Sequence, residues 1–189
     1  MAKKRRIDPN DSPPATTPRP DPPGTLLIDV RAFDAAVRGG EYYESFNVNS
    51  KNYMDRSRGT RLFIAECNRL LARCVGFSSR PRPAETREAF ELIFDLLQRI
   101  DEGNDDVFFA DEAGSWQVGV AWEDVLPAWF ASLAKAADPE DLGKAVARVV
   151  EDFEPHASPK HYAAARRVAT AAQREALGRS IRAAQRGTR

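Results

Sequence analysis

The amino-acid sequence predicts an all-α protein: a helical bundle or a short stack of helix hairpins, with a small β-hairpin insertion and a disordered N-terminal tail. Two observations lead to this prediction. Apolar residues recur at three- and four-residue steps along most of the 189 residues. Short breaks rich in proline and glycine separate these segments from one another. Hydrophobic residues make up 42% of the chain, which suffices for a single core in a chain of this length.

Residues 1–24 are predicted to be a disordered, basic and proline-rich tail. Seven of the thirteen prolines precede Thr25, and almost no apolar side chain is available there to offset the entropy of ordering. We divide the remainder into a helical domain at 25–155 and a basic C-terminal helix at 156–189.

The first part of the helical domain reads as an extended segment at 25–30 and a short helix that Gly39 and Gly40 end. Residues 41–55 are interpreted as a short helix followed by a loop. The first long helix is expected at 58–75, with Phe63, Cys67, Leu70, Leu71 and Cys74 on one face.

Five further elements follow along the chain. A helix is predicted to begin at Pro83 and to end at Asp101. Another is predicted to begin at Asp138-Pro139-Glu140-Asp141, which combines a capping acid with a first-turn proline, and to end at Phe153. Between them we expect a β-hairpin around WQVGVAW, because apolar and small residues alternate there, and a helix at 123–137. A last helix is predicted from Ser158 to about Gln185.

The stretch FFADEAGSWQVGVAWEDVLPAWF and the capped helix DPEDLGKAVARVVEDF together resemble a HEAT-like helical segment of uncharacterised bacterial proteins. The resemblance covers residues 60–153. It implies a packing unit and a scaffold role, and it transfers no active residue.

Charge is unevenly distributed although the formal total is zero. Residues 85–154 carry 18 acidic and five basic side chains, a net charge of −13, whereas residues 155–189 carry eight basic and one acidic side chain, a net charge of +7. Attraction between these two parts of the same chain is one expected use of the basic helix.

The sequence indicates a cytoplasmic protein. No apolar run reaches the roughly 18 residues of a membrane span, and no apolar segment of a signal peptide follows Lys3 to Arg6. Cys67 and Cys74 lie about 10 Å apart along a helix, too far for a disulfide, so both are expected to be reduced, buried and unreactive.

The acidic loop is the densest set of oxygen ligands, and its six acids are Asp101, Glu102, Asp105, Asp106, Asp111 and Glu112. Tested as an EF-hand that begins at Asp101, it has Gly103 at the third position and Asp106 where glycine is required. We therefore interpret it as a solvated loop or a docking patch for a basic partner, and a metal-dependent enzyme that uses this loop is the least favoured alternative. His156 and His161 are expected to lie in solvent, since no paired ligand spacing accompanies them.

Three tryptophans, at positions 116, 122 and 129, follow the acidic loop, and any of them that is exposed would be a natural interface anchor. Two basic regions offer a second kind of surface. One interleaves Tyr42, Tyr43, Phe46 and Tyr53 with asparagine and basic residues, and the other is the arginine-rich last helix.

The function expected from these features is a non-catalytic protein-protein interaction or scaffold module. The alternative is a nucleic-acid-binding protein that uses its basic N- and C-terminal flanks. No phosphate-binding loop or catalytic motif is present, and no cofactor is expected; the sequence leaves the oligomeric state open. The candidate interaction residues are Asp105, Asp106, Asp111, Glu112, Trp116, Trp122, Arg167, Arg174 and Arg182.

Overall fold

The structure, a computed structural model, describes residues 24–53, 55–104, 106–109 and 114–187. In these ranges it contains only helices, so the predicted all-α class is confirmed. The tail predicted at 1–24 lies outside the described residues except for Gly24. The α-helices are α1 (Thr25–Arg38), α2 (Arg58–Phe77), α3 (Pro83–Asp101), α4 (Trp122–Ala136), α5 (Pro139–Phe153), α6 (Ser158–Val168) and α7 (Ala171–Gly187), and two short 3-10 helices are η1 (Gly114–Val118) and η2 (Pro155–Ala157).

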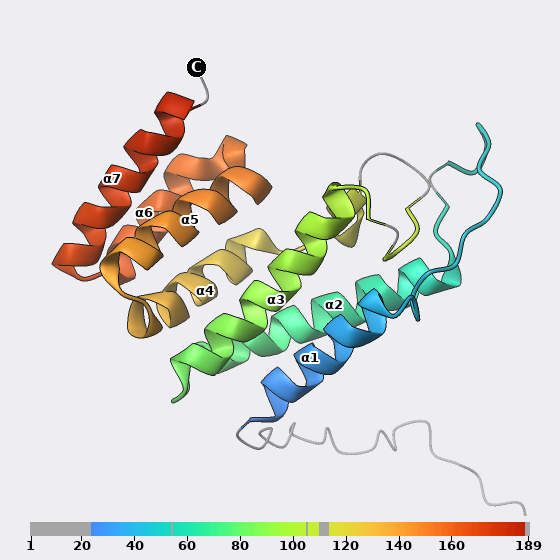
Figure 1. Cartoon of the computed structure of the whole chain (residues 1–189), viewed down its shortest axis with the longest axis horizontal. Coiled ribbons are helices and arrows are strands. Elements are labelled where there is room, and N and C mark those ends of the chain that lie inside the picture. Colours follow the sequence, from blue (N-terminus) through green and yellow to red (C-terminus); the bar gives the residue numbers. More distant parts are fainter. Residues whose placement is uncertain (1–23, 54, 105, 110–113, 188–189) are drawn as a thin grey trace, which may run out of the picture.

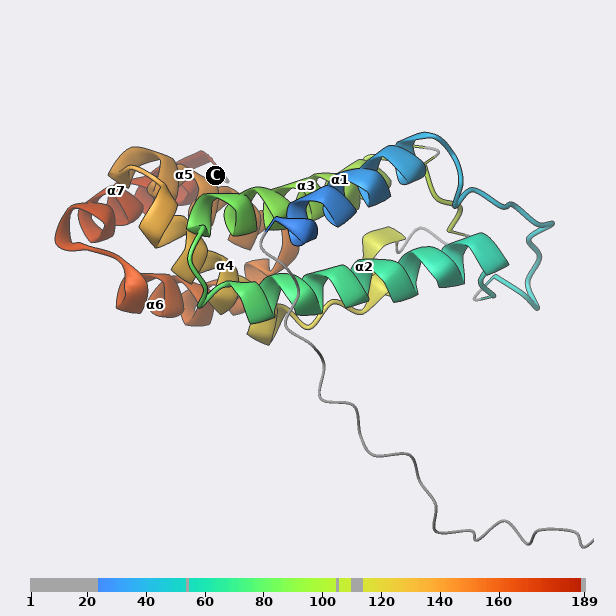
Figure 2. The same ribbon diagram turned by 90° about the horizontal axis from the view of Figure 1, so that it is seen from below.

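The helices form two groups joined by α4 (Figures 1 and 2). Helices α1, α2 and α3 lie together at one end of the molecule, and α5, α6 and α7 lie at the other. Helix α4 packs against α2 and α3 on one side and against α6 on the other. A single hydrophobic core therefore runs through both groups, with Trp129 and Phe130 of α4 at its centre.

Local capping explains why three helices begin where the sequence predicts. The Ser57 hydroxyl accepts the Thr60 N–H at 2.9 Å, and the Asp138 carboxylate accepts the Asp141 N–H at 2.9 Å. Pro83 and Pro139 stand in first turns, where the N–H groups have no helical partner. The predicted helices at 83–101 and 139–153 match α3 and α5, and the predicted helix at 58–75 is two residues shorter than α2.

Two predictions for the first part of the domain are wrong. Residues 25–30 are helical, because Leu26, Val30, Phe33 and Val37 form one buried stripe at steps of three and four residues. Residues 41–53 form turns without a helix. The backbone of this segment is held against α2: a Cβ added to Gly59 would lie 2.2 Å from the Tyr42 carbonyl oxygen.

The predicted β-hairpin is also wrong, since residues 114–118 form the 3-10 helix η1. The alternation from Trp116 to Trp122 does not separate two faces of a strand. Trp116 is 76% exposed, while Gln117 and Val118 are both buried. Gly119 then adopts a left-handed conformation with a φ of 66°, which turns the chain toward α4.

The last predicted helix is two helices. The backbone of Ala169 is extended, and Thr170 begins α7 with a reciprocal capping box. The Gln173 side chain accepts the Thr170 N–H at 2.9 Å, and the Thr170 hydroxyl accepts the Gln173 N–H at 3.3 Å. The chain therefore reverses, and α7 packs along α5.

Candidate functional site

The candidate site is built around η1, which side-chain hydrogen bonds from α2 and α3 hold in place. The Asp101 carboxylate at the end of α3 accepts both the Ser115 N–H, at 2.8 Å, and the Ser115 hydroxyl, at 2.6 Å. On the other side the Asn68 amide of α2 donates to the Val118 carbonyl at 2.8 Å. The short helix is thus fixed to two long helices.

Trp116 projects from this fixed segment into solvent. Its side chain is 76% exposed, the largest exposed fraction among the large hydrophobic residues that the structure describes as exposed. An indole ring held in this way loses little conformational freedom when it binds a partner, because its backbone is already ordered.

A cleft of about 340 Å³ lies beside Trp116, between the end of α3, the start of α4 and the end of α5. One wall is aromatic: the rings of Trp122 and Phe153 stack with centroids 4.8 Å apart and planes 24° apart. Three of the other lining residues are acids. The lining residues are Asp101, Ser115, Trp116, Gly119, Val120, Trp122, Asp152, Phe153 and Glu154.

The acidic side chains of the cleft lack strong cationic partners. Partial burial raises the pKa of Asp152, Arg148 lowers it, and the charges of Glu102 and Glu151 raise it further. The contact between Arg148 and Asp152 is long, at 3.8 Å. Glu154 lies 3.6 Å from the buried His161 Nε2. A cation entering the cleft would therefore find carboxylates that the protein itself only partly neutralises.

This arrangement suits recognition of a cationic side chain. An arginine or lysine can lie over an indole face while its charged end meets carboxylates. No cluster of three or more histidine, cysteine or acidic side chains placed to hold a metal ion occurs in the parts of the chain that the structure describes.

The structure separates the three tryptophans. Trp116 and Trp122 line the same cleft, as their proximity in sequence would allow, whereas Trp129 is fully buried in the core. Trp129 contacts Phe94 edge-on with a centroid distance of 5.4 Å. Only the first two are thus placed to meet a partner at this cleft.

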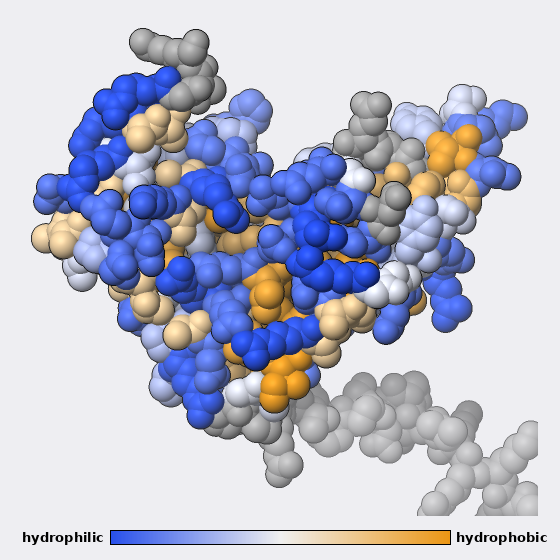
Figure 3. All heavy atoms as spheres, in the orientation of Figure 1, coloured by the Kyte–Doolittle hydropathy of each residue, from blue (hydrophilic) through white to orange (hydrophobic). Residues whose placement is uncertain are grey.

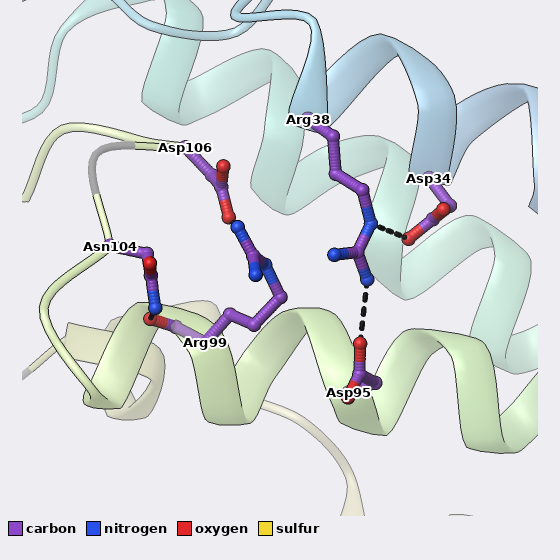
Figure 4. A network of polar contacts seen from close by, with 6 residues as sticks. All are labelled: Asp34, Arg38, Asp95, Arg99, Asn104 and Asp106. Carbon is purple, nitrogen blue, oxygen red and sulfur yellow. Dashed lines mark hydrogen bonds and ion pairs between the residues drawn. The ribbon is translucent and has the colours of Figure 1, made fainter.

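Asp106, a candidate interaction residue, is turned inward (Figure 4). It is only 8% exposed, and its carboxylate accepts a hydrogen bond from the Arg99 guanidinium at 2.8 Å. The Asn104 amide donates to the Arg99 carbonyl in the same turn. Asp106 therefore holds the loop after α3 in place. The other candidate acids, Asp105, Asp111 and Glu112, lie outside the described residues.

The three candidate arginines are exposed on α6 and α7. Arg174 donates to the Ala169 carbonyl at 2.7 Å and so helps to end α6. For Arg167 and Arg182 the described residues supply no hydrogen-bond acceptor. Part of the basic charge faces the acidic part of the chain, since Arg179 pairs with Glu140 of α5 and with Glu175.

His161 differs from the prediction, while His156 and the two cysteines agree with it. His156 is exposed, but His161 is 2% exposed, because α6 packs against α4 and α5. Cys67 and Cys74 are both free and buried. Burial raises the pKa of each thiol to about 12, which makes the neutral, unreactive form dominant.

The aromatic residues at 42–53 are divided between the core and the surface. Tyr42 packs edge-on against Phe33, and Phe46 packs against Phe108. Tyr43 and Tyr53 are exposed by 43% and 52%. Tyr43 also packs edge-on against Phe108, so its ring and that of Phe46 flank Phe108 edge-on and do not form a parallel row.

Sequence reasoning missed the contribution of α5 to the cleft. Glu151, Asp152 and Glu154 stand at the C-terminal end of this helix, where no basic residue occurs in the last turn. Acids at this end oppose the helix dipole. That local conflict was the available sequence signal for Asp152 and Glu154, whereas Glu151 accepts a hydrogen bond from the Tyr162 hydroxyl at 2.5 Å.

In the portions of the chain that the structure describes, no helix combines the length and the apolar character required to cross a membrane. Comparison of the chain with protein-family models, with curated proteins and with solved structures finds no match.

Proposed function

We propose that this protein is a non-catalytic interaction module that binds a protein partner through the cleft beside Trp116. The observation that carries this proposal is the exposure of Trp116 on a segment that Asp101 and Asn68 hold in place. A large exposed aromatic side chain is unfavourable in water, and tryptophan is among the residues most enriched at binding hot spots.

The chemistry of the cleft specifies which partner side chain it would accept. Asp101, Asp152 and Glu154 line it together with the stacked rings of Trp122 and Phe153. An arginine or lysine of the partner fits both features, since its stem packs on the rings and its charge pairs with the carboxylates. The resemblance of residues 60–153 to a HEAT-like packing unit supports the same class of function.

A peptide titration tests the proposal. A short peptide with a central arginine is compared with the same peptide carrying neutral citrulline, and the tryptophan indole N–H signals of the full chain are followed by NMR. We expect the arginine peptide to shift the Trp116 signal, which Trp116→Ala identifies by its loss. Trp116→Ala and Asp152→Asn should each weaken binding about tenfold, as loss of about 1.4 kcal/mol implies.

Tyr53→Ala is the matched control, because Tyr53 is also an exposed aromatic residue and does not line the cleft. It should bind the arginine peptide as the wild type does. Equal binding of the citrulline peptide, or binding that survives Trp116→Ala, would contradict the proposal. A pull-down from nuclease-treated lysate with the wild type, Trp116→Ala and Tyr53→Ala then identifies partners that depend on this residue.

Nucleic-acid binding is the second candidate, and the C-terminal arginines favour it. Arg166, Arg167, Arg182 and Arg186 are exposed on α6 and α7, and no acceptor for them occurs among residues 24–187 as far as these are described. Guanidinium groups of this kind can contact phosphates without base specificity. The acidic cleft has the opposite charge and would take no part.

Salt dependence separates this candidate from protein binding. Binding of a fluorescent duplex DNA that needs these arginines would support it. Its affinity should fall roughly a hundredfold between 50 and 200 mM salt, because four phosphate contacts are expected to give a slope of about −3.6 in a plot of log affinity against log salt. Absence of binding at 50 mM salt would exclude it.

A further inference from the structure

The cleft beside Trp116 carries charge of one sign. Its lining includes the acids Asp101, Asp152 and Glu154 and no lysine or arginine. Asp101 accepts two hydrogen bonds from Ser115 and forms no ion pair with another residue that the structure describes. Every lining residue is at least partly exposed, so an occupant can reach all of them. The cleft is therefore an open site whose negative charge the described residues neutralise only in part.

The most basic run of the chain lies outside the described residues. Residues 3–6 are Lys-Lys-Arg-Arg, the only run of four consecutive basic residues in the sequence. Asp8 and Asp11 follow, so the positive charge is concentrated at these four positions. The stem of a lysine or arginine packs on an aromatic ring while its charged end pairs with a carboxylate. The cleft offers both features, since the stacked rings of Trp122 and Phe153 lie beside its acids.

The described part of the chain begins at the opposite end of α3 from the cleft. Helices α1 and α3 begin at the same end of the molecule and run in the same direction (Figures 1 and 2). A Cβ added to Gly24 would lie 3.7 Å from an Arg82 guanidinium nitrogen, at the start of α3. Asp101 ends α3, so the cleft lies about 28 Å from Arg82 at 1.5 Å per residue. Figure 3 shows hydrophilic side chains around the far end of α3, where a charged occupant suits the surface better than an apolar one.

Residues 3–6 are close enough in sequence to reach the cleft. Eighteen residue-to-residue steps separate Arg6 from Gly24. At about 3.3 Å per step they extend to about 60 Å, roughly twice the length of α3. The path can therefore pass around side chains and still end at the cleft. A segment tethered in this way binds as an intramolecular ligand, at an effective concentration of about a millimolar, so a weak intrinsic affinity suffices to fill the site.

We propose that residues 3–6 of this chain bind in the cleft beside Trp116 and compete there with the partner. This inference rests on the proposed function, because it requires that the cleft bind lysine and arginine side chains. The stems would pack on the stacked rings, and the charged ends would pair with the three acids. A segment that fills the cleft about nine-tenths of the time lowers the apparent affinity for a partner about tenfold. The segment thus sets how tightly a partner must bind in order to displace it.

A titration on the full chain tests this competition. The arginine peptide described above is titrated into the wild type and into two variants, at about 0.15 M salt so that long-range charge effects are screened. In the first variant, all four residues at 3–6 are replaced by glutamine. In the second, the segments 3–6 and 20–23 are exchanged, which keeps the composition and the net charge of the chain.

The exchange variant separates reach from charge. Its basic run would lie within four steps of Gly24, about 13 Å, which is too short to span α3. We expect both variants to bind the arginine peptide about tenfold more tightly than the wild type does. Before any peptide is added, the Trp116 indole N–H signal of the wild type should differ from that of both variants, because only the wild-type segment occupies the cleft.

Four results would overturn the inference, and each has a different meaning. Binding of the arginine peptide to none of the three chains would remove the proposed function as well. Equal binding to all three would keep the proposed function and show that residues 3–6 do not enter the cleft. Tighter binding by the glutamine variant alone would show a general effect of charge. Self-association in sedimentation that the glutamine variant abolishes would assign the segment to the cleft of a second copy of this chain.

Discussion

Gly143 of α5 lies directly against the backbone of Ala176 in α7. A Cβ at position 143 would be 2.9 Å from the Ala176 carbonyl carbon and 2.9 Å from the Ser180 hydroxyl. Ala176 and Leu177 are themselves fully buried. The two helices therefore approach closely because residue 143 has no side chain, and the basic C-terminal helix is packed onto the domain through this contact.

Replacement of Gly143 by alanine should destabilise the protein by about 1–3 kcal/mol, because the added methyl group forces α5 and α7 apart. Urea unfolding followed by circular dichroism measures the change. Gly76→Ala is the matched control, since Gly76 is an exposed helical residue with no atom within 4 Å of an added Cβ. Its substitution should stabilise α2 by about 0.5–1 kcal/mol. A stability gain from Gly143→Ala would refute the close approach.

The helices that could be predicted from the sequence are those whose signals are local. Asp138-Pro139 and Pro83 fix where α5 and α3 begin, and the apolar stripes fix their buried faces. The position of η1 depends on the Asp101 carboxylate, 14 residues away in sequence. The pattern of apolar residues within WQVGVAW contains no information about that contact.

The packing of α5 depends on a contact that is remote in sequence. Helix α5 packs mainly on α7 rather than on its neighbour α4. The chain reversal between α6 and α7 has a sequence signal, the capping pair Thr170 and Gln173. The alanine-rich residues on both sides of this pair fit one continuous helix, so a single helix was predicted. A stack of helix hairpins, one of the two predicted arrangements, therefore does not describe how α5 packs.

The capping box at the start of α7 should contribute measurably to stability. Thr170→Ala removes one capping hydrogen bond and is expected to cost about 1 kcal/mol, whereas Thr170→Ser should be close to neutral. Gln173 is 4% exposed and also donates to the Ala134 and Ala137 carbonyls of α4. Gln173→Ala should therefore cost about 1–3 kcal/mol, more than Thr170→Ala. Equal stability of both alanine variants in urea unfolding would disprove this ranking.

The two cysteines should resist modification in the folded protein. Their burial raises the pKa of each thiol to about 12, so almost no thiolate forms at pH 8. We expect a disulfide reagent such as Ellman's reagent to react with neither thiol in the native state and with both in 6 M guanidinium chloride. Rapid reaction of even one thiol at neutral pH would show that α2 opens locally.

The same thiols make stability depend on alkaline pH. In the unfolded chain a thiol ionises near pH 8.5–9, whereas in the folded chain it keeps its proton to about pH 12. Below pH 8.5 their contribution is fully present, and it is lost progressively as pH rises toward 12, because only the unfolded state releases protons there. The decline in unfolding free energy above pH 9 should be less steep in a Cys67→Ala/Cys74→Ala variant than in the wild type.

Replacement of Trp129 should lower the unfolding free energy strongly, whereas replacement of Trp116 should leave it nearly unchanged. Trp129 is fully buried and contacts Phe94 and Phe130, so Trp129→Ala should cost about 3–5 kcal/mol. Trp116 is 76% exposed, and the bonds that hold η1 come from the backbone and from other side chains, so Trp116→Ala should change stability by less than about 0.5 kcal/mol. Thermal unfolding of the two variants measures both values. If Trp116→Ala instead unfolded the protein at a much lower temperature, the ring would be part of the core, and loss of binding in that variant would no longer indicate an interface.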